Sequence, residues 1–311
     1  MAVVGAGIMG ANHARVLHTM SQCDLVAVVD EDVVRGRAVS EASGCDYLST
    51  TEELLGLVDA VVVATPTPTH ASVGQELLRA GVDVLIEKPL ASSPAECHLL
   101  VQAAVDSGQL LMAGHIERFN PAVLELMRLA DDPVHMEFTR IGPFSPRVSS
   151  DVVLDLMIHD IDLALSLARA DVTSVSALGR SVVTDSLDVA SALISFGNGV
   201  TATLTASRVA QTKVRQVEVT QREAFIAADL VRQDVTISRL HHSEFLSERG
   251  PTYRQTGLIE IPFLEQRGEP LALELTHFVE CVTERRAPLV GGEEGRRALE
   301  IAYEVRRSAG F

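Results

Sequence analysis

Lys88 has a side chain and a sequence position that suit hydrogen-bond donation to a reacting group. It follows the apolar run Val82–Ile86 and stands between Glu87 and Pro89. Only two of the 26 lysine and arginine residues in the chain are lysines. An ammonium group is a compact, rotatable donor, which the planar fork of a guanidinium does not replace. We therefore interpret Lys88 as a candidate catalytic donor; the alternative is a lysine on a solvated loop.

An aspartate and a histidine lie one helical turn apart in the largely apolar segment Asp151–Leu163. Asp155 and His159 share a helix face with Asp151, Asp162 and Ser166 by the three-and-four spacing. A carboxylate one turn from an imidazole can fix its tautomer and raise its basicity, which suits a general base near neutral pH. The alternative is an ordinary amphipathic helix whose polar face is solvated.

A glycine pattern near the start of the chain predicts a dinucleotide site. Gly5, Gly7 and Gly10 follow a short apolar run and open a helical pattern, and Asp30 ends the next apolar run. The first glycine permits a tight turn, the second lets the backbone approach a pyrophosphate, and the third lets the helix pack on the strand. The pyrophosphate would then lie at the helix N-terminus. The alternative is a glycine-rich turn followed by a surface acid.

Two neighbouring acids predict which dinucleotide binds. Asp30 can accept hydrogen bonds from the adenosine ribose hydroxyls. Glu31 follows it and places a second negative charge where a 2′-phosphate would lie. We therefore expect NAD rather than NADP as the cofactor.

The loop Thr65–His70, with the sequence Thr-Pro-Thr-Pro-Thr-His, follows another apolar run. Ligands of open parallel sheets bind outside the carboxyl ends of the strands. We therefore expect this loop, the glycine turn and Lys88 to face one crevice, with Thr65 and His70 on the nicotinamide side. The alternative is a rigid proline turn with Thr69 as a helix N-cap. The residues predicted to bind the cofactor are Gly5, Gly7, Ile8, Met9, Gly10, Asp30, Thr65, Pro66, His70 and Glu87.

The amino-acid composition excludes several classes of protein. The 311 residues suffice for two domains, and 47% hydrophobic residues exclude a disordered chain. A formal net charge of −16 argues against binding to nucleic acid or to anionic membranes, although a local arginine cluster can still bind an anionic substrate. No apolar run has the length of a membrane span. The four cysteines lack metal or disulfide spacing, so we expect reduced thiols, no metal site and a cytoplasmic protein.

Residues 1–118 alternate apolar runs with amphipathic stretches, which predicts an α/β domain with a doubly wound parallel sheet. The runs are Ala2–Val4, Leu25–Val29, Ala60–Ala64, Val82–Ile86 and Leu110–Ala113. The helical patterns between them span residues 8–20, 32–43, 69–80 and 93–107.

Residues 119–311 have a different pattern, which predicts a separate α+β domain. A helix is predicted over 151–168, and the turn Phe196–Gly199 is expected to join two strands in a hairpin. Hairpin-linked strands imply a mainly antiparallel sheet. Two further helices are predicted over 270–284 and 293–308. The segments with period-two alternation include Ser174–Ala177, Ala190–Phe196, Val200–Ser207 and Val214–Gln221.

These motifs together resemble the Gfo/Idh/MocA family of sugar and inositol dehydrogenases, over essentially the whole chain. The resemblance implies a Rossmann domain joined to a domain with an open sheet, which often mediates homodimers or homotetramers. It also implies that Lys88, Asp155 and His159 are the catalytic group of an NAD-dependent oxidoreductase acting on a CH–OH group. The family often has glycine where this chain has Met157. The matching residues are Gly5, Gly7, Gly10, Thr65-Pro66 with His70, Glu87-Lys88-Pro89, Asp155, His159 and Ile161-Asp162.

Two stretches, Gly114–Ala122 and Gly142–Arg147, resemble segments of UDP-N-acetylglucosamine 3-dehydrogenases. This resemblance implies oxidation at C3 of a UDP-N-acetylhexosamine. A free inositol or sugar is the alternative substrate. A non-catalytic sensor that binds NAD and a sugar is a third possibility, but such a protein would be expected to lose the lysine or the histidine.

A nucleotide sugar carries a diphosphate, which guanidinium groups bind in a bidentate manner. Arg118, Arg140 and Arg147 are the candidates, against the alternative that they are solubilising surface groups. Asn120 is a candidate for binding a sugar hydroxyl, or else it starts a turn before Pro121.

Replacing Lys88 by methionine is expected to lower turnover sharply and to leave NAD binding intact. The variant loses the donor to the reacting oxygen and the positive charge that favours a developing alkoxide. Steady-state kinetics and NAD titration measure the two effects separately. Wild-type turnover in the variant would show that Lys88 is not catalytic.

Overall fold

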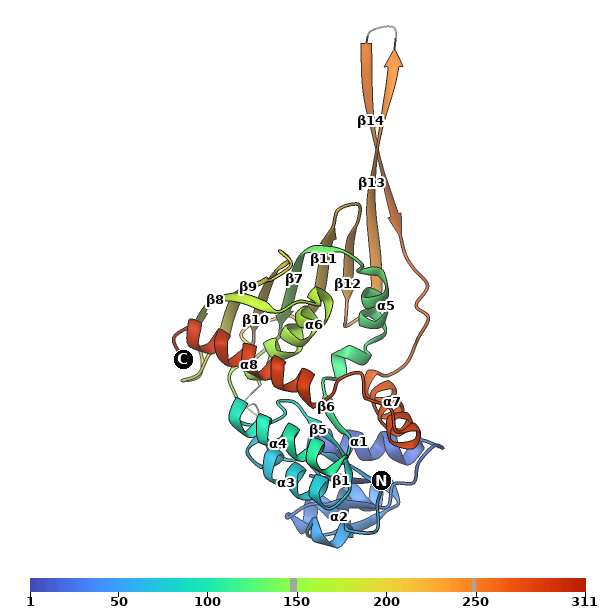
Figure 1. Ribbon diagram of the computed structural model, residues 1–311, viewed down its shortest axis with the longest axis vertical. Coiled ribbons are helices and arrows are strands. Elements are labelled where there is room, and N and C mark those ends of the chain that lie inside the picture. Colours follow the sequence, from blue (N-terminus) through green and yellow to red (C-terminus); the bar gives the residue numbers. More distant parts are fainter. Residues whose placement is uncertain (146–149, 248–249) are drawn as a thin grey trace. The chain divides into compact units, whose positions relative to one another are not determined.

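The structure is a computed structural model that describes residues 1–145, 150–247 and 250–311, except the side chains of 241–255. The chain divides into two compact units. The first unit comprises Met1–Phe119 and Gly268–Tyr303, and the second comprises Asn120–Arg267 and Glu304–Phe311. Figure 1 shows the chain coloured along its sequence.

The first unit is built on a six-stranded parallel sheet with the strand order β3-β2-β1-β4-β5-β6. The apolar side chains of the central strands are fully buried, as expected for strands covered on both faces. This arrangement confirms the predicted doubly wound sheet. The strands are β1 (Ala2–Val4), β2 (Ala27–Val29), β3 (Asp46–Leu48), β4 (Ala60–Val63), β5 (Asp83–Glu87) and β6 (Leu111–Gly114).

Helices of the first unit pack in pairs, α1 with α2 and α3 with α4. Helix α7 also packs on α1 and on the 3-10 turn Ile116–Phe119. The prediction placed all of 119–311 together, whereas α7 and most of α8 lie with the first unit. The helices are α1 (Ile8–Thr19), α2 (Val33–Ser43), α3 (Thr67–Arg79), α4 (Pro94–Ser107), α7 (Pro270–Glu284) and α8 (Gly292–Ser308).

Side-chain contacts explain why α7 lies with the first unit. The Phe119 ring lies 5.3 Å from the His277 ring, measured between centroids. Arg285, just after α7, binds the buried carboxylate of Asp83 and the carbonyl of Gly108. These partners are far from α7 in the sequence, so helical periodicity alone does not reveal them.

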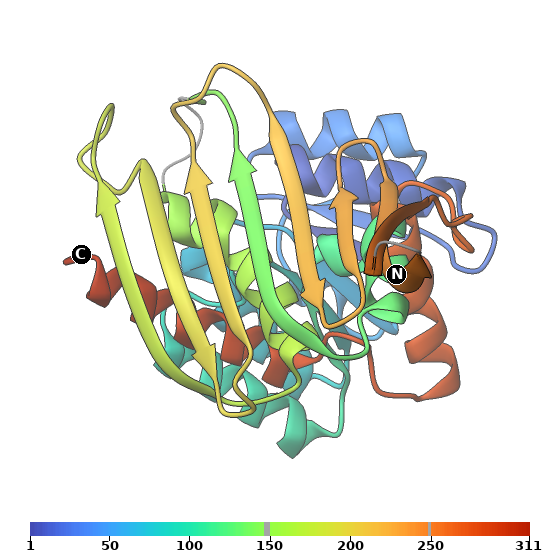
Figure 2. The ribbon, with the colours of Figure 1, turned by 90° about the horizontal axis from the view of Figure 1, so that it is seen from above.

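The second unit contains an eight-stranded sheet with the order β14-β13-β12-β11-β7-β10-β9-β8, shown in Figure 2. Only β7 and β10 pair in parallel; the other neighbours are antiparallel, which confirms the predicted mainly antiparallel sheet. The predicted turn Phe196–Gly199 joins β9 to β10, with Gly199 at φ +87°. The strands are β7 (Pro133–Ile141), β8 (Val172–Arg180), β9 (Val189–Phe196), β10 (Thr201–Ser207), β11 (Val214–Gln221), β12 (Phe225–Asp229), β13 (Asp234–Ser247) and β14 (Gly250–Glu260).

Two helices pack on this sheet. Helix α5 (Pro121–Leu129) contacts β12 and β13, and α6 (Ile158–Ala168) contacts β7 and β10. The predicted helix over 151–168 is confirmed as a continuous helix from Val152 to Ala168, in which Val153–Met157 is a π-helical turn that continues into α6. On β8 and β9, Leu178 and Leu193 are exposed.

Strands β13 and β14 form a long hairpin that projects beyond the other strands of the sheet (Figure 1). Strand β12 pairs with β13 only from Asp234 to Ser238. From Arg239 to Ser247, β13 pairs with β14 alone. The hairpin therefore continues as a two-stranded ribbon.

A buried ion pair ties α6 to the sheet. The Arg140 guanidinium of β7 donates to both carboxylate oxygens of Asp160, at 2.8 to 3.0 Å. Each residue is 2% exposed. Arg140 was one candidate for binding a substrate diphosphate, but the structure places it in the interior of the second unit. Its partner Asp160 lies beside His159, so the pair fixes the helix that carries the candidate base.

Replacing Arg140 by methionine is expected to destabilise the second unit by about 3–5 kcal/mol, because it leaves the Asp160 charge buried without its cation. The double variant Arg140→Met/Asp160→Leu should recover most of this loss. Chemical denaturation followed by circular dichroism provides the measurement. A loss below about 1 kcal/mol in the single variant would mean that the pair behaves like an exposed one.

Candidate active site

The turn between β1 and α1 has the geometry of a pyrophosphate site. Gly5 has φ +97°, and a Cβ there would lie 2.6 Å from the Ala64 carbonyl oxygen. A Cβ on Gly10 would lie 1.7 Å from the Gly5 carbonyl oxygen. A Cβ on Gly7 would meet nothing within 4 Å, and no side chain caps the first turn of α1. The backbone amides that follow Gly7 at the start of α1 are therefore accessible to an anionic ligand.

A cleft of about 470 Å³ opens at this turn within the first unit. Five of the predicted cofactor residues line it: Gly5, Gly7, Asp30, Thr65 and Pro66.

Other residues lining this cleft are not among those predicted. They include Arg35, Thr69 and the segment Ser49–Glu52, which follows the short strand β3. Strand β3 has no long apolar run, so sequence pattern gave little sign of it.

Asp30 is held by four donors. Its carboxylate accepts from the amides of Ala6 and Asp32, at 2.6 and 2.8 Å, and from two nitrogens of Arg35, at 2.8 and 3.2 Å. Burial opposes the charged form, but these donors hold the pKa of Asp30 below its usual range. A carboxylate has about four acceptor positions. A ribose hydroxyl can therefore bind Asp30 only if Arg35 gives up its position.

His70 connects two loops and does not line the cleft. Its ring nitrogens lie 2.8 Å from the carbonyl oxygens of Pro89 and Thr65. It is buried, and burial lowers the pKa of the imidazole despite these contacts. His70 thus connects the Thr-Pro loop to the Lys88-Pro89 loop, and its predicted place on the nicotinamide side stays a prediction. Thr69 does not cap α3, which begins at Thr67.

Glu87 bonds within the first unit as well. Its Oε1 lies 2.8 Å from Nε2 of His13 in α1, and its Oε2 accepts from the Lys88 amide at 3.2 Å. Burial opposes ionisation, but the hydrogen bond and charge of His13 and the charge of Lys88 hold the pKa of Glu87 below its usual range. Lys88 itself is partly exposed at the end of β5.

A second acid, Glu274 of α7, is completely buried near Glu87. Within the described part of the chain, neither of its carboxyl oxygens has a hydrogen-bond partner. Burial, and then the negative charge of Glu87, raise the pKa of Glu274 well above its usual range. Glu274 was not predicted, although it shares the apolar face of Leu271, Leu275 and Phe278, where an acid is unusual.

The helix predicted to carry the base begins in an unusual way. Asp151 accepts from the amides of Val153 and Leu154 and so caps the π-helical turn. Asp155 lies in that turn and is partly exposed, whereas His159 is 8% exposed. Asp162 is also buried. The polar stripe is therefore largely buried, which disfavours the alternative of a solvated helix face.

Lys88 belongs to the first unit, and Asp155 and His159 belong to the second. The joint action of these three residues stays a prediction.

The substrate-binding candidates lie in different settings. Arg118 is buried in the turn Ile116–Phe119 of the first unit. Asn120 caps α5 through the Ala122 amide and donates to the Leu230 carbonyl, so its side chain makes the predicted turn. Arg147 lies outside the described residues. In the described parts of the chain, no helix is long and apolar enough to span a membrane, and no group of three or more acidic, histidine or cysteine side chains could hold a metal.

Replacing Glu274 by glutamine is expected to stabilise the protein increasingly as the pH rises above about 5. A glutamate in the unfolded chain loses its proton near pH 4.3, roughly, whereas the folded state must keep Glu274 protonated or bury a charge. Wild-type stability therefore falls with pH by up to about 1.4 kcal/mol per unit until the folded-state pKa is reached. Glutamine is neutral throughout.

Thermal unfolding at several pH values measures this difference. Glu280→Gln, on the exposed side of the same helix, is the matched control and should show no such trend. A pH-independent difference between Glu274→Gln and wild type would contradict the raised pKa.

Known proteins share this architecture over the whole chain. Residues 1–115 match the model of the oxidoreductase family with an NAD-binding Rossmann fold, and residues 134–226 match the GFO/IDH/MocA C-terminal domain. The chain is 34% identical to UDP-N-acetylglucosamine 3-dehydrogenase of Acidithiobacillus ferrooxidans, over 98% of this chain and 95% of that protein.

A second relative and a solved structure also match nearly the whole chain. The chain is 29% identical to scyllo-inositol 2-dehydrogenase (NAD(+)) of Bacillus subtilis, over 99% of this chain and 93% of that protein. A solved structure of the Acidithiobacillus ferrooxidans enzyme matches with a TM-score of 0.90 at 33% identity, covering 100% of this chain and 97% of that one. With the open glycine turn and the cleft beside Asp30, these findings show that the chain belongs to the Gfo/Idh/MocA family and is an NAD-dependent oxidoreductase that acts on CH–OH groups.

Proposed function

We propose that this enzyme oxidises the C3 hydroxyl of a UDP-N-acetylhexosamine to a ketone and transfers the hydride to NAD. The observation that carries this proposal is the similarity to a UDP-N-acetylglucosamine 3-dehydrogenase, which extends over 98% of the chain. The buried setting of His159 and the accessible glycine turn support it.

The proposed chemistry assigns one role to each catalytic residue. His159 takes the hydroxyl proton as the hydride leaves the same carbon. Asp155 orients the imidazole and stabilises the imidazolium that forms. Lys88 donates a hydrogen bond to the reacting oxygen, and its charge favours the developing alkoxide. The bound nicotinamide supplies the hydride acceptor.

The first unit contains residues suited to two parts of the cofactor. We assign the pyrophosphate to the amides after Gly7, and the ribose to Asp30 once Arg35 yields. Glu87 holds the strand end beside Lys88 through its bond to His13. Arg118 and Arg147 stay the proposed cations for the substrate diphosphate, and Asn120 the proposed sugar ligand.

Two features support further parts of the proposal. The described cysteines are all free thiols, which is compatible with a reducing cytoplasmic setting. Exposed apolar side chains on the sheet of the second unit, such as Leu178 and Leu193, support a homodimer or homotetramer formed through that sheet.

A free inositol is the second candidate substrate. The supporting observation is the similarity to a scyllo-inositol 2-dehydrogenase over 99% of the chain, at a lower identity of 29%. A free inositol has no diphosphate, so it would make no use of the proposed arginines.

Incubation with NAD, UDP-N-acetylglucosamine and an acceptor that recycles the cofactor is expected to yield a 3-keto product two hydrogens lighter, detected by mass spectrometry. Uridine diphosphate should also raise the melting temperature, because a ligand that binds only the folded state stabilises it. His159→Asn should abolish product. Lys213→Met, at the only other lysine, is the matched control for Lys88→Met and should retain activity.

The negative result is equally informative. Absence of product and of stabilisation by uridine diphosphate, with NAD binding confirmed, would contradict the nucleotide-sugar substrate. Turnover of a free inositol in the same assay would then establish the second candidate.

A further inference from the structure

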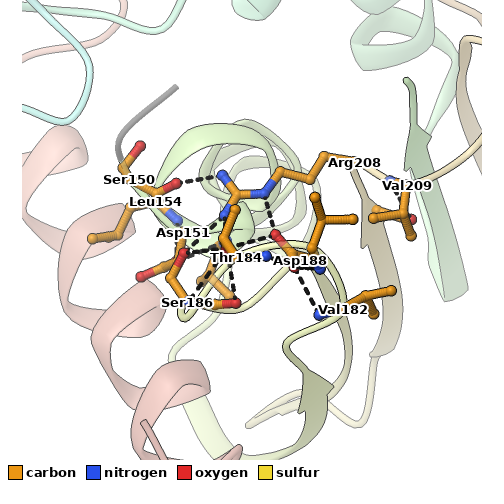
Figure 3. Close-up of polar contacts among 12 residues, drawn as sticks. Ser150, Asp151, Leu154, Val182, Thr184, Ser186, Asp188, Arg208 and Val209 are labelled. Carbon is orange, nitrogen blue, oxygen red and sulfur yellow. Dashed lines mark hydrogen bonds and ion pairs between the residues drawn. The ribbon is translucent and has the colours of Figure 1, made fainter. Parts of the chain in front are cut away.

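A buried ionic cluster lies beside the start of the helix that carries Asp155 and His159 (Figure 3). Its centre is Asp188, which is completely buried just before β9. The Asp188 carboxylate accepts from the backbone amides of Val182, Val183 and Thr184, at 2.6 to 2.8 Å. Burial opposes its charge, but these amides and Arg208 hold the pKa of Asp188 well below its usual range. The loop before β9 is thereby wrapped around one carboxylate.

Arg208 joins this loop to the start of the helix. Its Nε donates to Asp188 at 2.7 Å, and its Nη2 donates to the hydroxyls of Thr184 and Ser186 at 3.1 and 2.8 Å. Its Nη1 donates to the carbonyl oxygen of Ser150 at 2.6 Å. Figure 3 shows the guanidinium between the loop and Ser150. One buried side chain thus bonds the loop and a specific main-chain carbonyl in a fixed geometry.

The residues after Ser150 are fixed by further bonds in the same unit. The Val152 amide donates to the carbonyl of Leu187, the residue before Asp188, at 2.9 Å. Asp151 caps the turn and forms an ion pair with Arg306, at 2.7 Å. The segment 150–152 is therefore bonded to three partners, Arg208, Leu187 and Arg306, before the π-helical turn.

The helix begins with the π-helical turn Val153–Met157. Such turns are rare, have one residue more per hydrogen-bonded ring than an α-helix, and occur often at functional sites. The extra residue changes the direction of side chains within the turn relative to those after it. Asp155 lies in the turn and His159 lies after it, so the geometry of the turn affects the direction of the Asp155 side chain relative to that of His159.

If Arg208 and Asp188 served only to stabilise the fold, a buried ion pair would not be required. A buried ion pair can often be replaced by apolar residues of similar volume without loss of stability. Arg208, however, also binds the Ser150 carbonyl directly before the turn, which an apolar side chain cannot do. The cluster therefore controls the position of the main chain where the turn starts.

We propose that Arg208 and Asp188 are positioning residues for the hydride-transfer reaction: by holding the Ser150 carbonyl they fix the π-helical turn that presents Asp155 to His159. This inference rests on the proposed function of Asp155 and His159. It assigns no contact between the cluster and the substrate or cofactor.

Kinetics of Arg208→Ala and Arg208→Lys test this proposal. Lysine keeps the charge, but its single nitrogen cannot hold Asp188, Ser150 and the two hydroxyls in one plane. We expect kcat to fall by about 10- to 100-fold in Arg208→Ala, the size of effect produced by a small misplacement of catalytic groups. The KM for NAD should stay at the wild-type value, because the cofactor cleft belongs to the first unit. Guanidinium ion, added far below denaturing concentrations, should partly restore kcat.

The pH profile separates positioning from stability. Asp155 misaligned with His159 supports the imidazolium less well, so the acidic limb of the kcat profile should move in Arg208→Lys. The matched control is Arg285→Lys, which weakens another arginine bonded to a buried carboxylate and a main-chain carbonyl, but in the first unit. This control should keep kcat and the pH profile of the wild type.

Two results would overturn the inference. The first is a folded Arg208→Ala variant with wild-type kcat and pH profile. The second is a loss of activity that follows the loss of thermal stability equally in the Arg208 and Arg285 variants, without rescue by guanidinium. Asp155→Asn and His159→Asn are assayed in parallel. If these keep wild-type turnover, the proposed catalytic roles fail whatever the Arg208 variants do.

Discussion

A charge that leaves water must find a partner, and this requirement shapes both units of the chain. Each of several buried carboxylates is bonded to a cation, an imidazole or backbone amides, and each holds the main chain next to a proposed functional residue. The carboxylate at the end of β2 fixes the glycine turn, and the one at the end of β5 fixes the strand before Lys88. Two more hold the helix of His159 at its start and along its length. These carboxylates are Asp30, Glu87, Asp188 and Asp160.

Structural features that depend on the spacing of nearby residues could be predicted from the sequence. Glycines at fixed separations followed by an acid specify the turn, because the strand, turn and helix are contiguous there. The alternation of apolar runs and helical patterns likewise predicted the parallel sheet. The π-helical turn could not be predicted, because it depends on Arg208 and Asp188, which lie far from it in the sequence. The attachment of α7 to the first unit depends on equally distant partners.

The sequence is also silent on which charged residues are buried. In the sequence Arg140 resembles a surface cation, whereas in the structure it is paired with Asp160 on the helix that packs against its strand. Glu274 carried a signal that could have been used, since it lies on the apolar face of its helix. Asn120 was open to two interpretations, and the structure shows that its amide caps α5. For Arg140 the deciding contact is made by the fold and not by neighbours in the sequence.

The ion pair between Arg35 and Asp30 occupies carboxylate oxygens that are also proposed to bind the cofactor ribose. Under the proposed role of Asp30, the adenosine ribose and the guanidinium compete for the same carboxylate oxygens, and NAD would bind by an exchange and not by simple addition. Half of the Arg35 side chain is exposed, at 48%, and dissolved salt weakens an ion pair in such a setting. Added salt therefore weakens the ion pair between Arg35 and Asp30. Because this ion pair competes with the ribose for Asp30, its weakening favours the binding of the negatively charged cofactor.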